Sequence, residues 1–459
     1  METLEQLKAG LLTGIKRLDL SCGLTEFPRE IFDLADWLEI LNLSGNQLSS
    51  LPDDLPRLHK LRIIFCSDNL FTELPAVLGH CKNLTMVGFK ANQISRVPAE
   101  ALASTLRWLI LTDNRIQSLP NSIGQCKQMQ KLMLAGNELN DLPVDLANCA
   151  NLELLRLSAN QFSTLPPWLL TMPRLAWLAL AGNPLTDSFE AARKAQSIAA
   201  IDWREIELGA KLGEGASGVI YQAKLRQADT SDMPVKDVAV KLFKSSVTSD
   251  GMPRCEMAAS IAVGLHPNIV GVMGKIRHHP NGEQGSVMPL IASNYTNLAQ
   301  PPSLESCTRD VYAQETAFSL QELSNLALVI ARAAEHLHTC GILHGDLYGH
   351  NILHNSKGHG LLGDFGAASF LPMQDQDTSH GLQRIEVRAF GILLSELLSH
   401  CSESNDDANH PIFQATKSSL YELQKRCTQA DVSARPLFSE VVQLLSFINL
   451  HMEVASSSS

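Results

Sequence analysis

Apolar residues in the first 190 positions recur in one arrangement, L-x-x-L-x-L-x-x-N-x-L-x-x-L-P, in which leucines alternate with polar residues before an asparagine and a proline. The asparagine returns at intervals of 22 or 23 residues: Asn46, Asn69, Asn92, Asn114, Asn137, Asn160 and Asn183. An L-x-L alternation predicts a short strand with one buried face. Because no single copy can bury its own leucines, we expect the copies to stack into a solenoid.

A shorter copy around Leu18, Leu20 and Pro28 precedes these and brings the number of copies to eight. The asparagine amide carries donors and an acceptor that can satisfy a tight turn inside the stack, and the proline ends each hydrogen-bonded run. These residues resemble the leucine-rich repeat family over about residues 14–190. The resemblance implies a curved solenoid with a parallel sheet on its concave face, and we assign residues 1–190 to this domain.

The positions that face outward between the alternating leucines predict what the solenoid does. One such column is mostly apolar: Ile40, Ile63, Met86, Trp108, Lys131, Leu154 and Trp177. If this column lies on the concave face, it forms an exposed apolar stripe, and such stripes usually bind proteins. We therefore expect a protein partner or substrate there. The alternative is that another part of this chain, or a second copy, covers the stripe.

The sequence also predicts the structure at the two ends of the repeat array and the role of its cysteines. Leu4, Leu7 and Leu11 have helical spacing and predict a cap on the first coil. Residues 186–202 favour a helix, and we interpret residues 191–202 as a cap and linker. Three cysteines stand six residues after a repeat proline, where another copy has a leucine, and so predict core filling: Cys81, Cys126 and Cys149.

From Trp203 the repeats give way to mixed strand-like and helix-like segments that carry polar motifs. A GxGxxG run holds Gly213, Gly215 and Gly218, and glycines let a backbone approach phosphates closely. Alone, this run is shared with dinucleotide-binding folds. The motifs that follow it remove the ambiguity: Val-Ala-Val-Lys ending at Lys241, His-Pro-Asn from His266, His-Gly-Asp ending at Asp346, Asn351, Asp-Phe-Gly from Asp364, and Arg435-Pro436.

In this order and spacing the motifs resemble the eukaryotic-like protein kinases across about residues 203–450. The resemblance implies a bilobal α+β fold in a multidomain chain, with ATP as phosphate donor and Mg²⁺ as metal ion. It assigns the α- and β-phosphates to Lys241, with Glu256 as the carboxylate partner of that lysine. It also assigns the substrate hydroxyl to Asp346, which orients and deprotonates it, and Mg²⁺ to Asn351 and Asp364.

The same resemblance predicts the adenine pocket. Met288 is expected at its back, the carbonyl of Pro289 accepts from the adenine amine, and Ile291 offers its backbone N–H. Three apolar side chains are expected to sandwich the ring: Val219, Ala239 and Leu353. No motif assigns a role to residues 293–318, which lie between this pocket and the next helix.

Several positions depart from the kinase pattern. Gly345 replaces the arginine that receives a phosphorylated activation segment in many kinases, so we expect activity not to depend on phosphate at Thr378 or Ser379. The segment from Asp364 to Glu386 is short and lacks Ala-Pro-Glu, which predicts a reduced platform for a peptide substrate. Arg435, the usual partner of that glutamate, needs another partner or stays in solvent.

The expected function is ATP-dependent phosphate transfer to a protein hydroxyl in intracellular signalling. Serine or threonine is favoured, although Tyr348 replaces the lysine typical of that class. Two alternatives remain open. A pseudokinase scaffold is favoured by the missing Ala-Pro-Glu and opposed by the intact Lys241, Asp346 and Asn351. A small-molecule phosphotransferase also combines His-Gly-Asp with an asparagine five residues after the aspartate.

Composition narrows the setting. The 459 residues carry a net charge of −11, which argues against a nucleic-acid binder held by phosphate contacts. Ten cysteines without a CxxC pair disfavour a zinc site and favour a reducing compartment. With no basic leader and no long apolar run, we expect a cytoplasmic protein without a membrane span. Residues 455–459 are a small polar segment, and we assign residues 451–459 to a disordered tail. The oligomeric state is not predicted.

Overall fold

The computed structural model describes residues 2–186, 198–215, 217–226, 235–244, 248, 250–402 and 411–456. These residues form two compact units, Met1–Leu175 and Ala176–Ser459. No helix within the described ranges combines the length and apolarity that a bilayer span requires.

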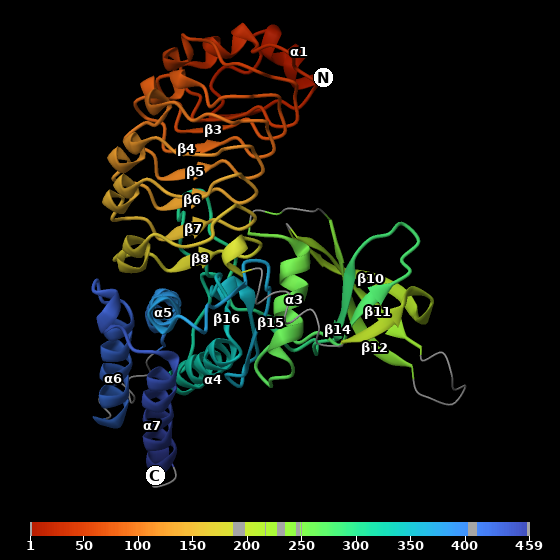
Figure 1. Cartoon of the computed structure of the whole chain (residues 1–459), viewed down its shortest axis with the longest axis vertical. Coiled ribbons are helices and arrows are strands. Elements are labelled where there is room, and N and C mark those ends of the chain that lie inside the picture. The colour runs from red at the N-terminus through yellow and green to blue at the C-terminus, as the bar shows by residue number, and fades with distance from the viewer. Residues whose placement is uncertain are drawn as a thin grey trace. The chain divides into compact units, whose positions relative to one another are not determined.

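The first unit is a solenoid of parallel three-residue strands, which follow one another in chain order in Figure 1. The strands are β1 (Arg17–Asp19), β2 (Ile40–Asn42), β3 (Ile63–Phe65), β4 (Met86–Gly88), β5 (Trp108–Ile110), β6 (Lys131–Met133) and β7 (Leu154–Arg156). Each coil returns through a short 3₁₀ turn: η1 (Arg29–Leu34), η2 (Leu55–Arg57), η3 (Ala76–His80), η4 (Ala99–Ala101), η5 (Asn121–Gln125), η6 (Val144–Asn148) and η7 (Pro167–Thr171). The parallel sheet predicted from the repeats is confirmed.

The repeated asparagines connect successive coils by hydrogen bonds. Asn114 is buried, and its amide nitrogen donates to the carbonyl oxygens of Phe89 at 2.9 Å and Leu111 at 3.0 Å. Its oxygen accepts from the backbone N–H of Ile94 at 2.9 Å. One side chain therefore satisfies backbone groups of its own coil and of the preceding coil, which explains why the asparagine recurs in every regular copy.

The residue before each of these asparagines has a left-handed backbone. Its φ is +51° at Asp68, +53° at Ala91 and +73° at Gly45, and the same holds before the other asparagines. Glycine adopts this conformation without cost, whereas an alanine pays a penalty from its Cβ atom. Each alanine in this column is therefore a strained position that the stacking of the coils maintains.

The first unit begins with a short helix, and its predicted core-filling cysteines are buried. Helix α1 (Glu2–Lys8) buries Leu7, although Leu11 lies beyond the helix and is exposed. The thiols of Cys81, Cys126 and Cys149 are buried, and burial raises the pKa of Cys126 to about 12 and of Cys149 to about 11. These cysteines are therefore unreactive parts of the solenoid core.

The outward column is less exposed than predicted. Ile40 and Trp108 are half-buried, and Ile63 and Met86 are buried. Neighbouring side chains of the sheet cover one another: the ammonium of Lys131 lies 4.5 Å from the ring centroid of Trp108. The stripe is thus a packed apolar surface with a cation over one of its aromatic rings.

The second unit begins with the strand of the last repeat, β8 (Trp177–Ala179), and continues with a six-stranded sheet in the order β10-β11-β12-β14-β13-β9. Its strands are β9 (Ala199–Asp202), β10 (Ile206–Glu214), β11 (Gly218–Leu225), β12 (Lys236–Phe243), β13 (Gly274–Arg277) and β14 (Gly285–Pro289). All pairs are antiparallel except β9 with β13. Helix α3 (Pro253–Val263) accompanies this sheet.

The helix predicted over residues 186–202 is wrong at its C-terminal end. Residues Ala199–Asp202 form β9, which pairs with β13, and Ile201 joins the core of the sheet. The strand partner outweighs the weak helical preference of an alanine-rich segment. The rest of that prediction falls on residues 187–197, which lie outside the described residues.

The remainder of the second unit is mainly helical. Its long helices are α4 (Leu320–Thr339), α5 (Gln376–Ser399), α6 (Pro411–Cys427) and α7 (Phe438–Ser456). Two small sheets join them: β15 (Thr296–Asn297) with β17 (Ile352–His354) and β18 (Gly360–Leu362), and β16 (Ile342–Leu343) with β19 (Ser369–Phe370). Helix α7 extends to Ser456, beyond the position where a disordered tail is predicted to begin.

The buried Arg435 forms hydrogen bonds to backbone oxygens, where the kinase pattern has a salt bridge to the glutamate of Ala-Pro-Glu. Its guanidinium donates to the backbone carbonyl oxygens of Gln429 at 2.8 Å and Arg384 at 3.2 Å. These contacts hold the segment before α7 against helix α5 without a salt bridge to an Ala-Pro-Glu motif.

Candidate functional site

A cleft of about 680 Å³ lies between the sheet and the helical part of the second unit. It is lined by most of the residues that the kinase motifs predicted: Gly213, Gly215, Ala239, Lys241, Glu256, Met288, Pro289, Ile291, Asn351, Leu353 and Asp364. Gly218, Val219 and Asp346 are not part of this lining. Gly218 has a packing reason instead, since an added Cβ atom would lie 2.4 Å from the carbonyl oxygen of Leu242.

The glycine-rich turn leaves an open surface toward the cleft. Cβ atoms added at Gly213 or Gly215 would meet no neighbour, so their absence keeps room for a ligand. Between them, Glu214 forms ion pairs with Lys211 and Lys244. The hydrogen bonds from Lys211 and Lys244 lower the pKa of Glu214 to about 2, which keeps this carboxylate charged and the turn tied to the sheet.

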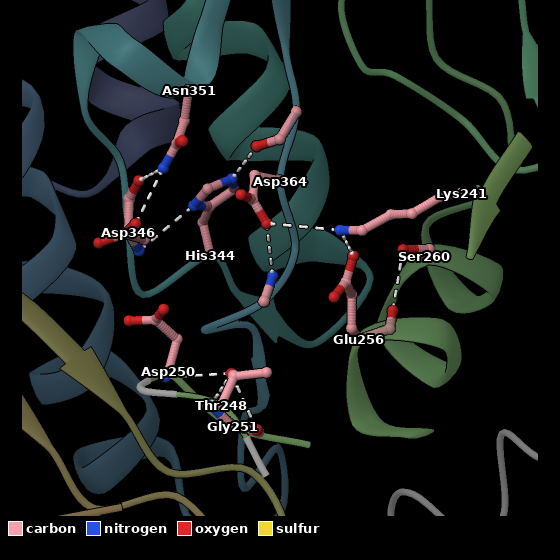
Figure 2. Close-up of polar contacts among 12 residues, drawn as sticks. Lys241, Thr248, Asp250, Gly251, Glu256, Ser260, His344, Asp346, Asn351 and Asp364 are labelled. Carbon is pink, nitrogen blue, oxygen red and sulfur yellow. Dashed lines mark hydrogen bonds and ion pairs between the residues drawn. The ribbon is translucent and has the colours of Figure 1, made fainter. Parts of the chain in front are cut away.

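On the opposite side of the turn, Lys241 of β12 pairs with Glu256 of α3, and both side chains are nearly buried. The ammonium also lies 4.0 Å from a carboxylate oxygen of Asp364 (Figure 2). Burial opposes the charge of Lys241, but the two carboxylates outweigh it and raise the pKa of Lys241 above its usual value. Ser260, one turn beyond Glu256, donates to the backbone carbonyl oxygen of Glu256 at 2.8 Å.

Across the cleft, the loop between β16 and β17 places Asp346 beside Asn351. The amide nitrogen of Asn351 donates to the carboxylate and to the backbone oxygen of Asp346, both at 2.9 Å (Figure 2). His344 shapes the start of this loop: its Nδ1 lies 3.3 Å from the backbone nitrogen of Asp346, and its Nε2 lies 2.9 Å from the carbonyl oxygen of Gly363. The residues 344–351 are called the catalytic loop below.

The buried carboxylate of Glu386 in α5 anchors the catalytic loop through hydrogen bonds to its backbone. Its carboxylate accepts backbone hydrogen bonds from His344 at 3.2 Å and Gly345 at 2.6 Å, and it pairs with Nε2 of His338 at 2.8 Å. Burial by itself raises the pKa of a carboxyl group, but these hydrogen bonds and the nearby histidines lower the pKa of Glu386 below its usual value. Helix α5, in which the shortened segment ends, thus provides the catalytic loop with an anionic anchor.

Strand β8 covers the other side of the catalytic loop. The indole of Trp177 stacks on the ring of Tyr348 at 4.1 Å between centroids, and its N–H donates to the carbonyl oxygen of Leu347 at 3.0 Å. Gly345 has a φ of +74°, and an added Cβ atom would lie 2.8 Å from the carbonyl oxygen of Leu178. The added Cβ atom would also lie 2.6 Å from the carbonyl oxygen of Ala367, so the left-handed backbone and the packing of both segments disfavour an arginine at this position.

The residues predicted to hold a metal ion offer the appropriate donors. The amide nitrogen of Asn351 faces Asp346, which leaves its oxygen as the ligand atom, and the Asp364 side chain is half exposed at 52%. Asp364 has a left-handed φ of +53°, a strained conformation that is common at functional sites. Amide and carboxylate oxygens in an open cleft fit Mg²⁺, which binds a few protein oxygens and keeps other positions for phosphate and water.

Three features of this site escaped the sequence analysis. The Trp177–Tyr348 stack and the Glu386 anchor involve partners far apart in the chain, and no local motif indicated either of them. The third is a pair between Asp310 and His350, in which Asp310 comes from the segment without an assigned motif.

Known protein families match stretches in both halves of the chain. The family described as protein kinase domain matches residues 206–387. Leucine-rich repeat families match residues 37–58, 104–162 and 127–185.

Individual relatives are distant. Fibroblast growth factor receptor 1 of Pleurodeles waltl is 25% identical over 284 residues, which are 52% of this chain and 34% of the receptor. The serine/threonine-protein kinase TNNI3K of Homo sapiens is 25% identical over 292 residues, 56% of this chain and 33% of that kinase. The serine/threonine/tyrosine-protein kinase HT1 of Arabidopsis thaliana is 24% identical over 299 residues, 56% of this chain and 70% of that kinase. The chain thus spans about a third of the first two proteins.

Proposed function

Because the chain carries leucine-rich repeats followed by a protein kinase domain, we propose that it is an ATP-dependent protein kinase acting on serine or threonine hydroxyls. The observation that carries the proposal is the convergence of Lys241 with Glu256, and of Asp346 with Asn351, around one cleft that also contains Asp364. The similarity to TNNI3K, a serine/threonine-protein kinase, supports serine or threonine as acceptor, whereas HT1 is a serine/threonine/tyrosine-protein kinase.

ATP binding follows from the two walls of the cleft. Ala239, Leu353, Pro289, Ile291 and Lys241 all line the cleft. The adenine ring would lie between Ala239 and Leu353, against the backbone of Pro289 and Ile291, and the phosphates would extend toward Lys241. A charged ammonium held by a buried carboxylate is a fixed positive group for the α- and β-phosphates. Mg²⁺ bound by Asn351 and Asp364 would neutralise charge on the β- and γ-phosphates.

Asp346 performs the step at the acceptor. Its carboxylate orients the substrate hydroxyl and accepts the hydroxyl proton, while the hydroxyl oxygen bonds to the γ-phosphorus and the bond from that phosphorus to the β,γ-bridging oxygen breaks. The hydrogen bond from Asn351 fixes the carboxylate for this role. In-line positioning of the two oxygens, together with electrostatic stabilisation of the phosphates, accounts for most of the catalysis in such reactions.

The repeats are proposed to bind a protein partner or substrate through the outward column that includes Ile40 and Trp108. A copurification with the Asp346→Asn chain tests this, comparing Trp108→Ala with Trp37→Ala, which changes an exposed tryptophan outside the column. Loss of a bound protein only in Trp108→Ala supports the proposal, and retention in both variants contradicts it. A cytoplasmic location is part of the same proposal, and the buried thiols of the solenoid suit a reducing compartment.

A transfer assay separates the proposed kinase from its two alternatives. The chain is incubated with γ-labelled ATP, magnesium and a generic protein substrate, and compared with Asp346→Asn and with Asp237→Asn, a control at an exposed strand position. Label on protein that disappears only in Asp346→Asn supports the kinase. Stabilisation by ATP without transfer indicates a scaffold, and label only on added small molecules indicates a small-molecule phosphotransferase.

A further inference from the structure

The segment 293–318, which carries no kinase motif, forms a closed loop against the catalytic loop. Its two arms meet at Gln300 and Val311, which exchange backbone hydrogen bonds of 2.8 and 3.0 Å. Its first arm pairs with β17 through β15, and the backbone N–H of Leu298 donates to the carbonyl oxygen of Ile352 at 2.9 Å. The segment is therefore attached to the chain directly after Asn351.

Asp310 lies where this closed loop meets the catalytic loop. Its side chain is fully buried, with 0% exposure, and its carboxylate accepts from the backbone N–H of His350 at 3.1 Å. The second carboxylate oxygen lies 2.7 Å from Nδ1 of His350. A buried carboxylate is stable only with such partners. The Asp310 carboxylate therefore depends on His350, and His350 is held in place by Asp310.

The neighbouring residue shows how closely the two loops pack. A Cβ atom added at Gly349 would lie 2.8 Å from the hydroxyl oxygen of Tyr312 and 3.1 Å from a carboxylate oxygen of Asp310. Tyr312 is itself held by Glu396 of α5, to which its hydroxyl donates at 3.2 Å. The glycine at position 349 therefore leaves room for the close approach of the catalytic loop to Asp310 and Tyr312.

We propose that Asp310 is a positioning residue for phosphate transfer, which acts by holding His350 and thereby Asn351 and Asp346. The proposal rests on the proposed kinase function. His350 directly precedes Asn351, and the amide of Asn351 holds the Asp346 carboxylate, so a shift at His350 displaces the acceptor carboxylate and one metal ligand together. Lys241 and Ala239 lie on β12, and Met288 lies on β14, so these residues keep their positions.

The experiment compares Asp310→Ala and Asp310→Asn with Glu315→Ala, a control that removes an exposed carboxylate from the same segment. In Asp310→Ala we expect kcat to fall about 10- to 100-fold, with KM for ATP changed less than about threefold. Asp310→Asn keeps an acceptor for the backbone of His350, so its kcat falls less. The control keeps the kinetics of the unmodified chain.

Two further measurements separate positioning from a general loss of structure. If Asp310 acts through His350, Asp310→Ala lowers kcat little in a chain that already carries His350→Ala. Hydrogen exchange of the backbone over residues 345–355 is faster in Asp310→Ala, while exchange in α3 and β12 is unchanged.

An unchanged kcat in folded Asp310→Ala overturns the proposal, as do full additivity with His350→Ala and unchanged exchange over residues 345–355. If Asp310→Ala does not fold, the same criteria apply to Asp310→Asn. Absence of transfer by the unmodified chain refutes the proposed kinase instead, and the exchange measurement still decides whether Asp310 holds the loop.

Discussion

Glu386 provides the most quantitative test of how the catalytic loop is held. Replacing it with glutamine keeps the shape but leaves a single acceptor oxygen in place of a carboxylate that serves His338, His344 and Gly345. At least one buried donor then faces an NH₂ group. A hydrogen bond to a charged group contributes about 1.5–3 kcal/mol, and breaking a buried charged pair costs about 3–5 kcal/mol. We expect Glu386→Gln to lower the free energy of unfolding of the second unit by about 3 kcal/mol.

The assay is urea unfolding of the full chain, monitored by hydrogen exchange in α4 and α5 so that the second unit is observed separately. Glu422→Gln, at an exposed position on α6, is the matched control and should change stability by less than about 0.5 kcal/mol. Because Gly345 precedes Asp346, phosphate transfer should also slow in Glu386→Gln. A variant as stable and as active as the control would refute the anchoring role.

Three further predictions concern the solenoid and the pH dependence. Asn114→Ala should destabilise the first unit by about 2–4 kcal/mol in urea unfolding because it leaves buried backbone groups unpaired. Asn121→Ala, at an exposed position, should not destabilise it, and equal effects of the two substitutions would contradict the role of the repeated asparagines. Ala91→Gly should stabilise the first unit by about 0.5–1 kcal/mol because it relieves the strain of a left-handed alanine. Ala99→Gly, in a 3₁₀ turn, should destabilise the first unit. A loss of stability in both variants would contradict the inference that Ala91 is strained. Burial raises the pKa of Glu396 to about 7, so the folded chain binds this proton more tightly than the unfolded chain and stability falls as pH rises from about 4.5 to 7. Glu396→Gln should remove roughly 3 kcal/mol of that fall in unfolding measured across this pH range, and an unchanged pH profile would contradict the shift.

The solenoid was predictable because its contacts are local and repeated. Each coil meets only the next, so the strands, the asparagine ladder and the buried cysteines can be read from one template. The left-handed position before each asparagine was not predicted, since glycine, aspartate and alanine all occur there and no single residue type marks it.

The kinase motifs predicted the residues that line the cleft. The hydrogen bonds and ring contacts that hold these residues in place could not be predicted from the sequence. The Lys241–Glu256 pair lies 15 residues apart in the chain and follows a recognisable pattern. Asp310 and His350 lie 40 residues apart, Gly345 and Glu386 41, and Trp177 and Leu347 170. No local signal indicates such pairs in a single sequence.

Strand β9 was mistaken for a helix for the same reason. Ala199 and Ala200 have helical preference, and the partner that makes them a strand begins 75 residues later at Gly274. An added Cβ atom at Gly274 would lie 2.7 Å from the carbonyl oxygen of Ala199, so this glycine admits the strand. The long-range pairing therefore decided the local structure.

The most direct test of the central claim is the identity of the phosphorylated product. Protein labelled by γ-labelled ATP is hydrolysed to its amino acids, and the label is assigned to phosphoserine, phosphothreonine, phosphotyrosine or none, for the unmodified chain and for Asp346→Asn. The account predicts phosphoserine or phosphothreonine from the unmodified chain and neither from Asp346→Asn. Label confined to phosphotyrosine would contradict the acceptor class, and unchanged labelling by Asp346→Asn, or no labelled protein from a chain that binds ATP, would contradict the catalytic assignment itself.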